Sequence, residues 1–164
     1  MFGKLKSALG LEKRAIKIMS PIDGVVIALS EVADPAFAEE MLGRGVAIRP
    51  LAGRVVSPVN GKVTQMFDTR HAVSLTSDEG VEILIHIGLD TVKLKGEHFI
   101  ALVKTGDAVK VGDGLINFDL EAISGLGYDT ITPVVVCNSS DYKRFDTQTG
   151  IDVKSGDEII TLGS

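Results

Sequence analysis

Residues 70–88 read RHAVSLTSDEGVEILIHIG, and this stretch decides how the chain folds. Its two arms are rich in valine, isoleucine and threonine, which favour strands, and the SDEG segment between them is typical of a turn. The pattern predicts a β-hairpin with a four-residue loop, in which Thr76 pairs with Val81 and His71 lies opposite His86. Directly opposed residues have Cβ atoms about 4.5–5.5 Å apart, so the two imidazoles are expected to meet.

In this register the two histidines share an outward face with Val73, Leu75 and Leu84. The opposite face carries Ile83 and Ile85 and is predicted to face the core. A slip of one residue would place the histidines on opposite faces, and each would then be an ordinary strand residue at a sheet surface. The chain contains three histidines in all, so two at one place indicate metal binding, proton transfer or phosphoryl transfer.

Composition restricts the class of protein. With 164 residues the chain is expected to form one domain that buries about 70% of the surface of the unfolded chain. No apolar run approaches the roughly 20 residues that span a bilayer, and the first residues lack a signal-peptide pattern. The single cysteine, Cys137, excludes a disulfide framework and is expected to be a buried structural thiol. These features predict a cytoplasmic protein.

The formal net charge of −5 argues against a nucleic-acid-binding protein, because such proteins need basic patches to meet phosphates. It suits docking onto a basic protein surface. The sequence contains no G-x-x-x-x-G-K-[ST] loop and no G-x-G-x-x-G between a strand and a helix. Neither of these nucleotide-binding devices can therefore supply phosphoryl chemistry here.

Glycines punctuate short stretches rich in valine and isoleucine, which is typical of an all-β protein. We expect a compact antiparallel β-sandwich or barrel with at most short helical turns. Strands are predicted at 15–19, 24–29, 45–49, 53–56, 61–67, 71–76, 81–87, 99–104, 115–119, 132–137 and 159–162. A short helical turn is expected after Asp34, which can cap it, with Pro35 at its first position.

An internal repeat indicates duplication: SPIDG at 20–24 returns as SPVNG at 57–61. Asp-Gly and Asn-Gly both fit tight turns that need a positive φ. A further turn family of Gly-Asp pairs occurs at 106–107, 112–113 and 156–157. We expect these repeats to serve the fold rather than the function.

The first ten residues differ from the rest of the chain. Phe2, Leu5 and Leu9 recur at helical spacing beside two lysines, which is typical of a segment that lies on an anionic membrane surface. A frayed, solvated terminus is the alternative. We expect a flexible amphipathic tail at 1–15 and a single domain at 16–164.

The residues around the histidine pair suit phosphoryl transfer. A nucleophilic imidazole needs one nitrogen free and the other fixed by a hydrogen bond, and the turn at Gly88 can supply a carbonyl to His86. His71 can then donate to oxygens that gain negative charge during transfer. The hydroxyl of Thr69 can orient the His71 ring.

Two stretches carry a resemblance to a known family: TRHA at 69–72 and GVEILIHIGLDTVKLKGE at 80–97. The same family pattern fits SPIDG (20–24), GVAI (45–48), SPVNG (57–61), VKVGD (109–113) and TPVVV (132–136). From about residue 16 to its end, the chain resembles the glucose-type enzyme IIA of the bacterial phosphoenolpyruvate-dependent sugar phosphotransferase system.

The resemblance implies a phosphocarrier cycle on an antiparallel β-sandwich. The phosphoryl group would arrive from the carrier HPr onto Nε2 of His86 and pass to a cysteine of an enzyme IIB domain. His71 matches the family's second histidine, which supports the phosphoryl group. Thr69 matches the threonine bonded to that histidine, and Gly88 matches the glycine whose carbonyl orients the active ring.

The resemblance also implies a docking surface. Asp34 and Asp90 match acidic residues that meet arginines of the partner, and an apolar ring is matched by Phe37, Phe67, Leu84 and Val92. The tail resembles the membrane-touching segment of free-standing members. The cycle requires no cofactor, although family members can bind zinc between residues matching His71 and His86 and a partner carboxylate.

Two other classes remain open. His86 and Asp90 have the spacing of a ligand pair in lysostaphin-like zinc hydrolases, but those enzymes also carry a His-x-His pair that this sequence lacks. His98, where the family often has glycine, offers a third nitrogen or is a surface residue. A lipoyl-like carrier would share the Gly-Asp turns, but the lysine that it needs at a hairpin tip does not occur here.

Overall fold

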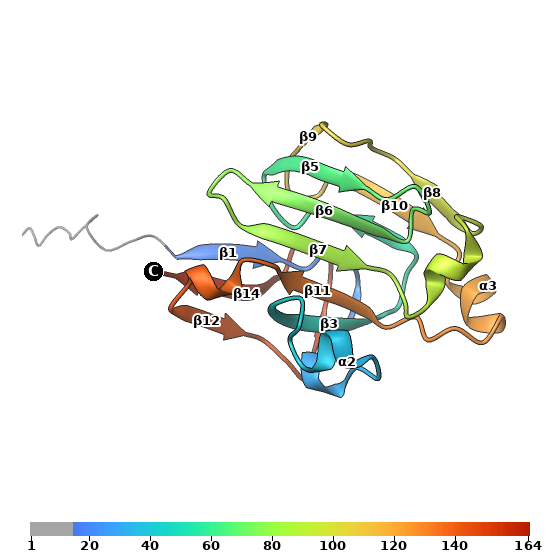
Figure 1. The fold of residues 1–164 in the computed structure, drawn as a ribbon, viewed down its shortest axis with the longest axis horizontal. Coiled ribbons are helices and arrows are strands. Elements are labelled where there is room, and N and C mark those ends of the chain that lie inside the picture. Colours follow the sequence, from blue (N-terminus) through green and yellow to red (C-terminus); the bar gives the residue numbers. More distant parts are fainter. Residues whose placement is uncertain (1–14) are drawn as a thin grey trace, which may run out of the picture.

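The structure is a computed structural model that describes residues 15–164 (Figure 1). Its strands are β1 (Ile16–Met19), β2 (Gly24–Ala28), β3 (Arg44–Pro50), β4 (Arg54–Val56), β5 (Gly61–Met66), β6 (Ala72–Ser77), β7 (Glu82–His86), β8 (Phe99–Ala101), β9 (Ala108–Val109), β10 (Gly114–Phe118), β11 (Thr132–Val136), β12 (Arg144–Thr147), β13 (Ile151–Val153) and β14 (Glu158–Gly163). The helical segments are short: η1 (Leu29–Glu31), α2 (Pro35–Ala38), η2 (Thr91–Leu94), α3 (Leu120–Gly125) and η3 (Ser139–Asp141). The all-β prediction is confirmed.

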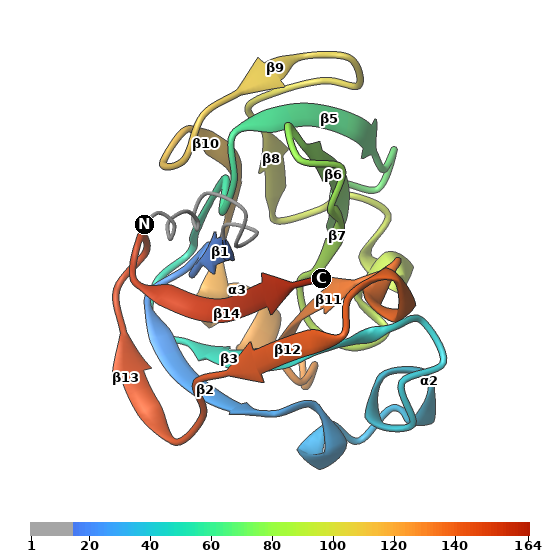
Figure 2. The ribbon, with the colours of Figure 1, turned by 90° about the vertical axis from the view of Figure 1, so that its left-hand side faces the viewer.

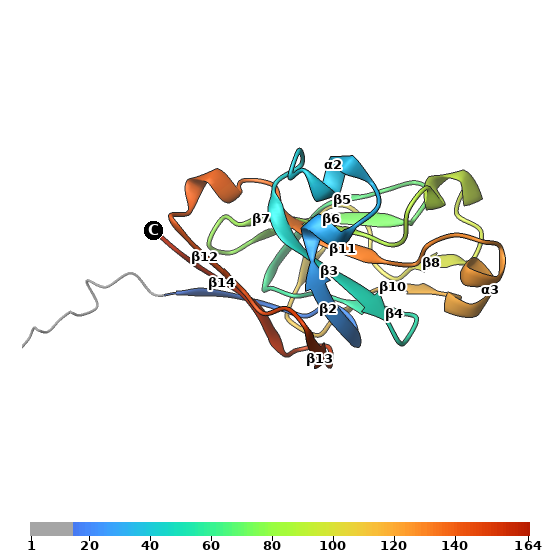
Figure 3. The same ribbon diagram turned by 90° about the horizontal axis from the view of Figure 1, so that it is seen from below.

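The strands form three sheets in which every pairing is antiparallel. The largest has the order β13-β2-β3-β11-β7-β6-β5-β9, and two three-stranded sheets have the orders β1-β14-β12 and β4-β10-β8. Seen from the end, these sheets surround a common interior (Figure 2). The α2 and α3 segments lie at the margin of this arrangement (Figure 3).

A single large cluster of buried aliphatic side chains fills the interior and draws on all three sheets. The pattern follows strand alternation: in β7, Ile83 and Ile85 are buried while Glu82 is exposed. The central strand β11 is buried at every position, because it is paired on both sides and covered on both faces. A smaller cluster around Phe37 covers the outer face of β3 and β11.

The internal repeat corresponds to two equivalent turns. Ser20 Oγ donates to the Ile22 carbonyl at 2.7 Å, and Ser57 Oγ donates to the Val59 carbonyl at 2.6 Å. The two turns also bond each other, because Met19 N–H donates to the Pro58 carbonyl and Val56 N–H donates to the Pro21 carbonyl. The predicted duplication is therefore built into the centre of the fold.

The reason for the glycine in each repeat differs from the prediction. Gly24 and Gly61 do not have positive φ values. Instead, a Cβ on Gly24 would lie 2.1 Å from the Arg49 carbonyl oxygen, and one on Gly61 would lie 2.1 Å from the Thr76 carbonyl oxygen. Each glycine opens a strand where a neighbouring backbone passes too close for any side chain.

The three Gly-Asp pairs do form left-handed turns. Gly106, Gly112 and Gly156 have φ values of 97°, 94° and 96°. In each turn the aspartate carboxylate accepts a backbone N–H from the residue three positions earlier, at 2.8–2.9 Å. Two of these turns dock onto the repeated serine turns, since Gly112 N–H donates to the Ser57 carbonyl and Gly156 N–H to the Ser20 carbonyl.

The predicted helical turn is present as α2. The carboxylate of Asp34 accepts the Ala36 N–H at 2.9 Å and Pro35 occupies the first position. The sequence analysis missed α3, which is capped by Asp119 in the same way. It also missed β9, β12 and β13, because these strands are only two to four residues long and lack clear hydrophobic alternation.

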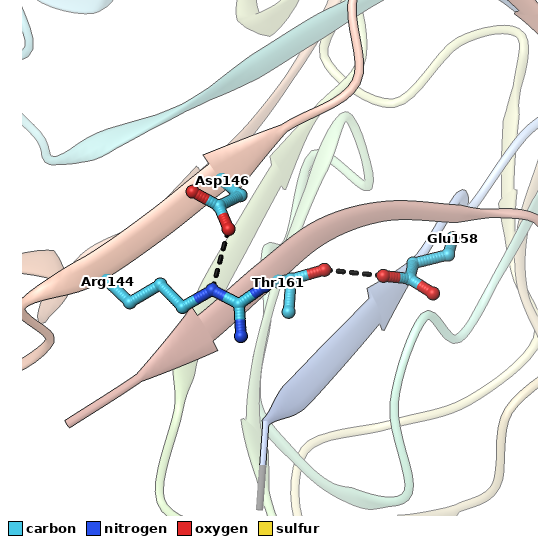
Figure 4. A network of polar contacts seen from close by, with 4 residues as sticks. All are labelled: Arg144, Asp146, Glu158 and Thr161. Atoms are coloured by element: carbon cyan, nitrogen blue, oxygen red, sulfur yellow. Dashed lines mark hydrogen bonds and ion pairs between the residues drawn. The ribbon is translucent and has the colours of Figure 1, made fainter.

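Each of the two C-terminal strands β12 and β14 contains a polar contact between its own side chains (Figure 4). Arg144 Nε donates to Asp146 Oδ2 at 2.6 Å within β12, and the hydroxyl of Thr161 on β14 donates to the carboxylate of Glu158. The exposed Arg144–Asp146 ion pair contributes about 0–1 kcal/mol. The position of these strands is therefore set mainly by the buried aliphatic residues of β14.

Two further predictions concern single features. The prediction for Cys137 is wrong: it follows β11 and is exposed, because the strand ends one residue earlier. Among the described residues, no helix is long and apolar enough to cross a bilayer. Residues 1–14 of the predicted amphipathic tail lie outside the described residues.

Candidate phosphoryl-transfer site

His86 is the last residue of β7, and the turn that follows fixes its ring. Its Nδ1 donates a hydrogen bond to the Gly88 carbonyl at 2.7 Å. A carbonyl can only accept, so Nδ1 carries the proton and the lone pair is left on Nε2. Gly88 has φ +76°, and a Cβ there would lie 2.9 Å from the Asp129 carbonyl oxygen. The turn that orients His86 therefore requires glycine.

The predicted hairpin register is wrong by one residue. Ser77 N–H donates to the Val81 carbonyl, which shortens the loop from the predicted four residues to residues 78–80. Gly80 has φ +94°, as expected for a three-residue hairpin loop that closes with a left-handed residue. As a result Ala72, rather than His71, lies opposite His86. The prediction that Val73 and Leu75 face outward is wrong for the same reason, and both are buried in the core.

The two imidazoles nevertheless meet, with ring centroids 4.9 Å apart and ring planes at 88°. This is because His71 precedes β6 and belongs to an irregular turn, so strand alternation does not set the direction of its side chain. The turn contains Arg70 in a left-handed conformation, with φ +57°. The contact is thus made across the ends of β6 and β7, which lie side by side in Figure 1.

His71 is buried rather than outward-facing, with 5% of its surface exposed. A hydrogen bond of 2.7 Å joins its Nδ1 to the hydroxyl of Thr69, as predicted. The edge of the Phe67 ring packs against the imidazole at a centroid distance of 5.8 Å. When the Thr69 hydroxyl donates to Nδ1, the proton of the neutral ring lies on Nε2, on the other side of the ring.

Burial keeps both imidazoles neutral. Burial, together with the neighbouring His86, lowers the pKa of His71 from 6.5 to about 4. Burial also lowers the pKa of His86, although the Gly88 carbonyl and the carboxylates of Asp34 and Asp90 oppose this shift. Both rings are therefore uncharged at neutral pH, which leaves the Nε2 lone pair of His86 available as a nucleophile.

Asp34 and Asp90 lie close enough to His86 to act on it electrostatically. Asp34 caps α2 and Asp90 precedes η2, where it has φ +62°. A pair of carboxylates beside a nucleophile that accepts a dianionic group does not attract that group. Their negative charge suits the arginines or lysines of a partner that brings the phosphoryl group.

The predicted apolar ring is present in part as a surface. Val92 is 49% exposed, and Phe67 and Leu84 are half-buried. Phe37 is only 4% exposed and instead packs its ring against His86 at 5.1 Å. Phe37 therefore supports the His86 ring and offers little contact surface to a partner.

Two exposed apolar residues were missed by the sequence analysis. Met41 and Leu42 follow α2 and are 70% and 42% exposed. They belong to the same segment of the chain as Asp34 and Phe37. The signal in the sequence was available, because an apolar pair directly follows the Glu39-Glu40 pair where a solvated loop would be polar.

His98 does not join the histidine pair. It has φ +74° and lines a separate open cavity of about 740 Å³ with residues of β8, β10 and α3. Within residues 15–164, no three side chains of the His, Cys, Asp and Glu types are grouped so that they could hold a metal ion. A metal between His71 and His86 would therefore need ligands from another molecule.

With this geometry established, comparison with known proteins assigns the family. Residues 16–142 match the family model described as phosphoenolpyruvate-dependent sugar phosphotransferase system, EIIA 1. The chain belongs to this family. The chain is 43% identical over 160 residues to a PTS system glucose-specific EIIA component of Oceanobacillus iheyensis, covering 98% of this chain and 97% of that relative.

The EIIA family includes free-standing and fused members, and this chain resembles both. It is 58% identical over 125 residues to a PTS system beta-glucoside-specific EIIBCA component of Bacillus subtilis, covering 76% of this chain and 20% of that relative. The chain thus spans about a fifth of the fused protein and nearly all of the free-standing one.

A solved structure of the family has the same fold. Glucose permease IIA from Mycoplasma capricolum superposes with a TM-score of 0.85 at 37% identity, covering 91% of this chain and 96% of that chain. The predicted resemblance to glucose-type enzyme IIA is therefore confirmed. The family assignment replaces the zinc-hydrolase alternative.

Proposed function

We propose that Nε2 of His86 accepts a phosphoryl group from phospho-HPr and passes it to a cysteine of an EIIB domain. The carrier role and its two partners follow from membership of the EIIA family. The choice of His86 is supported by one observation above all: its Nδ1–H is fixed on the Gly88 carbonyl at 2.7 Å, which leaves Nε2 unprotonated.

The transfer is a displacement at phosphorus. The lone pair of His86 Nε2 forms a new P–N bond while the P–N bond to the histidine of HPr breaks, and the electron pair of that bond returns to the HPr ring. Nδ1–H of His86 keeps its bond to the Gly88 carbonyl throughout, so the orientation of the ring does not change. The second step is the same displacement, with the thiolate of EIIB as the nucleophile.

His71 supplies a hydrogen bond to the phosphoryl oxygens. With Nδ1 held by Thr69, the ring proton is on Nε2, and the His86 ring lies 4.9 Å away between centroids. A preorganised donor in a buried site stabilises charge that develops during transfer. Because its pKa is about 4, His71 stays neutral and donates without forming a salt link that would trap the phosphoryl group.

The surroundings of the site suit a sequence of two protein partners. Val92 and the half-buried Phe67 and Leu84 provide apolar contact area, and Asp34 and Asp90 provide negative charge for basic residues of the partner. The chain carries a net charge of −5, in keeping with basic partner surfaces. We assign the reaction to the cytoplasm, with residues 1–10 as a weak contact to the membrane surface.

No cofactor takes part in this cycle. The two imidazoles could supply two of the four ligands of a tetrahedral zinc site, so a partner would have to provide the others. The sugar is selected by the permease that carries EIIB. The relatives named for glucose and β-glucosides make permeases of these two classes the acceptors to test.

The deciding experiment is phosphorylation with phosphoenolpyruvate, enzyme I and HPr, followed by mass spectrometry of the peptide that contains His86. We expect an acid-labile phosphate on His86 that depends on HPr, and none on His86→Ala. His98→Ala is the matched control, because that histidine lies apart from the site and should leave the phosphate unchanged. Phosphate on His71 in the wild type would contradict the proposal.

A further inference from the structure

Arg70 lies between Thr69 and His71 and forms the turn that delivers the second histidine. Its backbone is left-handed, with φ +57°, and its N–H donates to the Phe67 carbonyl at 2.8 Å. A non-glycine residue in this conformation is strained, and the surrounding structure must offset that strain. The side chain of Arg70 shows how it is held.

The guanidinium of Arg70 crosses to the loop that follows η2. Its Nη2 donates to the Gly96 carbonyl at 3.2 Å. A Cβ on Gly96 would lie only 2.4 Å from Nη2, so the guanidinium occupies the space that any other residue would fill. Gly96 itself has φ +91°, is buried, and thus provides both the conformation and the room for this contact.

The contact between Arg70 and Gly96 leaves part of the buried guanidinium without a hydrogen-bond partner. Arg70 Nε is buried and has no hydrogen-bond partner, and leaving such a donor unsatisfied is unfavourable. The guanidinium therefore sits in a constrained position where one of its donors is satisfied and another is not. An aliphatic side chain of similar length would avoid this cost but could not bond Gly96.

The loop that Arg70 reaches is the one that holds His86. It begins at Gly88, whose carbonyl fixes the His86 ring, and it is anchored by Thr91, whose hydroxyl donates to the Ile87 carbonyl. It then runs through η2 to Gly96. One arginine thus joins the turn that carries His71 to the loop that orients His86.

We propose that Arg70 is a positioning residue that sets the separation of the two imidazoles through its hydrogen bond to Gly96. The proposal rests on the phosphocarrier role proposed above and extends it to a residue outside the reacting groups. In such sites a displacement of about 1 Å lowers the rate of a step by up to roughly 100-fold. Removing the hydrogen bond from Arg70 to Gly96 leaves the bond between His86 and the Gly88 carbonyl intact and lets the turn that carries His71 move.

The test compares two steps of the cycle in Arg70→Met, which keeps the length of the side chain and removes its donors. We expect the rate of acceptance from HPr to stay within about twofold and the rate of transfer to EIIB to fall roughly 10- to 100-fold. Arg70→Lys should recover most of the transfer rate, because its ammonium can still donate to the Gly96 carbonyl. Arg49→Met, at an exposed arginine of β3, is the matched control and should change neither rate.

A purely structural role would give a different pattern. If Arg70 only stabilised the fold, both steps would fall together and in proportion to the loss of folded protein in thermal unfolding. That result, or an unchanged transfer rate in Arg70→Met, would overturn the proposal. Should Arg70→Met fail to fold, Arg70→Leu provides the same comparison, because it also removes every side-chain donor.

The two proposals fail in distinguishable ways. Absence of phosphate from His86 in the wild type refutes the carrier assignment itself. A wild type that is phosphorylated on His86 and an Arg70→Met variant that transfers normally refute only the role of the arginine.

Discussion

The two repeated serine turns and the two loops of the phosphoryl-transfer site are built on different principles. At 20–24 and 57–61 a buried serine hydroxyl closes each turn, and neither turn contains a left-handed non-glycine residue. Four of the five such residues in the described part of the chain lie between positions 70 and 98, and two of them, Arg70 and Asp90, belong to the loops of the site. The scaffold is locally relaxed, whereas the site is strained.

This difference indicates where the fold stores its strain. Left-handed backbone at Arg70 and Asp90 is unfavourable in isolation and persists only where surrounding contacts enforce it. Both residues flank a histidine ring that is itself fixed through Nδ1. The strain lies where ring orientation matters for transfer, and the repeated serine turns contain no left-handed non-glycine residue.

The largest effect on the transfer rate is expected from His71→Gln, a substitution in the phosphoryl-transfer site. The variant keeps an amide N–H but loses the imidazole that Thr69 holds in place, and losing one preorganised donor of this kind costs about 10²–10³-fold in rate. We expect transfer to EIIB to fall by this amount while acceptance from HPr is largely kept. Rapid-quench measurement of each step separates the two.

The division of roles would be contradicted if His71→Gln lost acceptance and transfer equally. A matched control is Ser20→Ala, which alters the scaffold and should leave both rates unchanged in the protein that remains folded. The contrast between these two variants tests whether strain and chemistry are confined to the site.

The pH dependence of stability should also distinguish the phosphoryl-transfer site from the repeated serine turns. His71 has a pKa of about 4 in the folded protein and 6.5 when unfolded, so the unfolded state binds the proton first as the pH falls. Stability is therefore unaffected by this group above pH 6.5 and is lost between pH 6.5 and about 4, by roughly 3 kcal/mol. Burial of His86 contributes in the same direction.

Urea unfolding of the wild type and of His71→Gln at several pH values measures this contribution. The variant lacks the buried imidazole, so its stability should fall less steeply between pH 6.5 and 4. Parallel curves for the two proteins would show that His71 is not buried in its neutral form as the structure indicates.

The same contrast explains what could be predicted from the sequence. Strand positions, the all-β class and the Asp34 cap follow from local patterns, and the structure confirms them. The hairpin register does not, because a three-residue and a four-residue loop differ only in how Gly80 closes the turn. The histidine contact was predicted for the wrong reason: it depends on Arg70 and the turn before β6, which no strand pattern describes.

The next prediction concerns the serine hydroxyls that close the two repeated turns. Ser20 and Ser57 are fully buried, and each hydroxyl is bonded to the backbone two residues on. Ser20→Ala and Ser57→Ala should each reduce the free energy of unfolding by about 1–3 kcal/mol, because each leaves a buried carbonyl without its donor. Chemical denaturation measures both values. Equal losses would show that the repeat is duplicated in energy as well as in geometry, whereas a large loss in only one copy would break the comparison.

The smallest effect is expected at His98, where strain lies near the site loops but outside the chemistry. His98 has φ +74°, and a left-handed non-glycine residue costs about 1–2 kcal/mol. His98→Gly removes that backbone strain. It also gives the unfolded chain more conformational entropy, which lowers stability by roughly 0.5–1 kcal/mol, so a net gain in stability below about 1 kcal/mol is expected. Thermal unfolding detects this change, and both transfer rates should stay as in the wild type. A loss of stability would show that contacts of the imidazole in its cavity outweigh the backbone strain, and a loss of transfer would show that this strain, like that at Arg70, is coupled to the histidine pair.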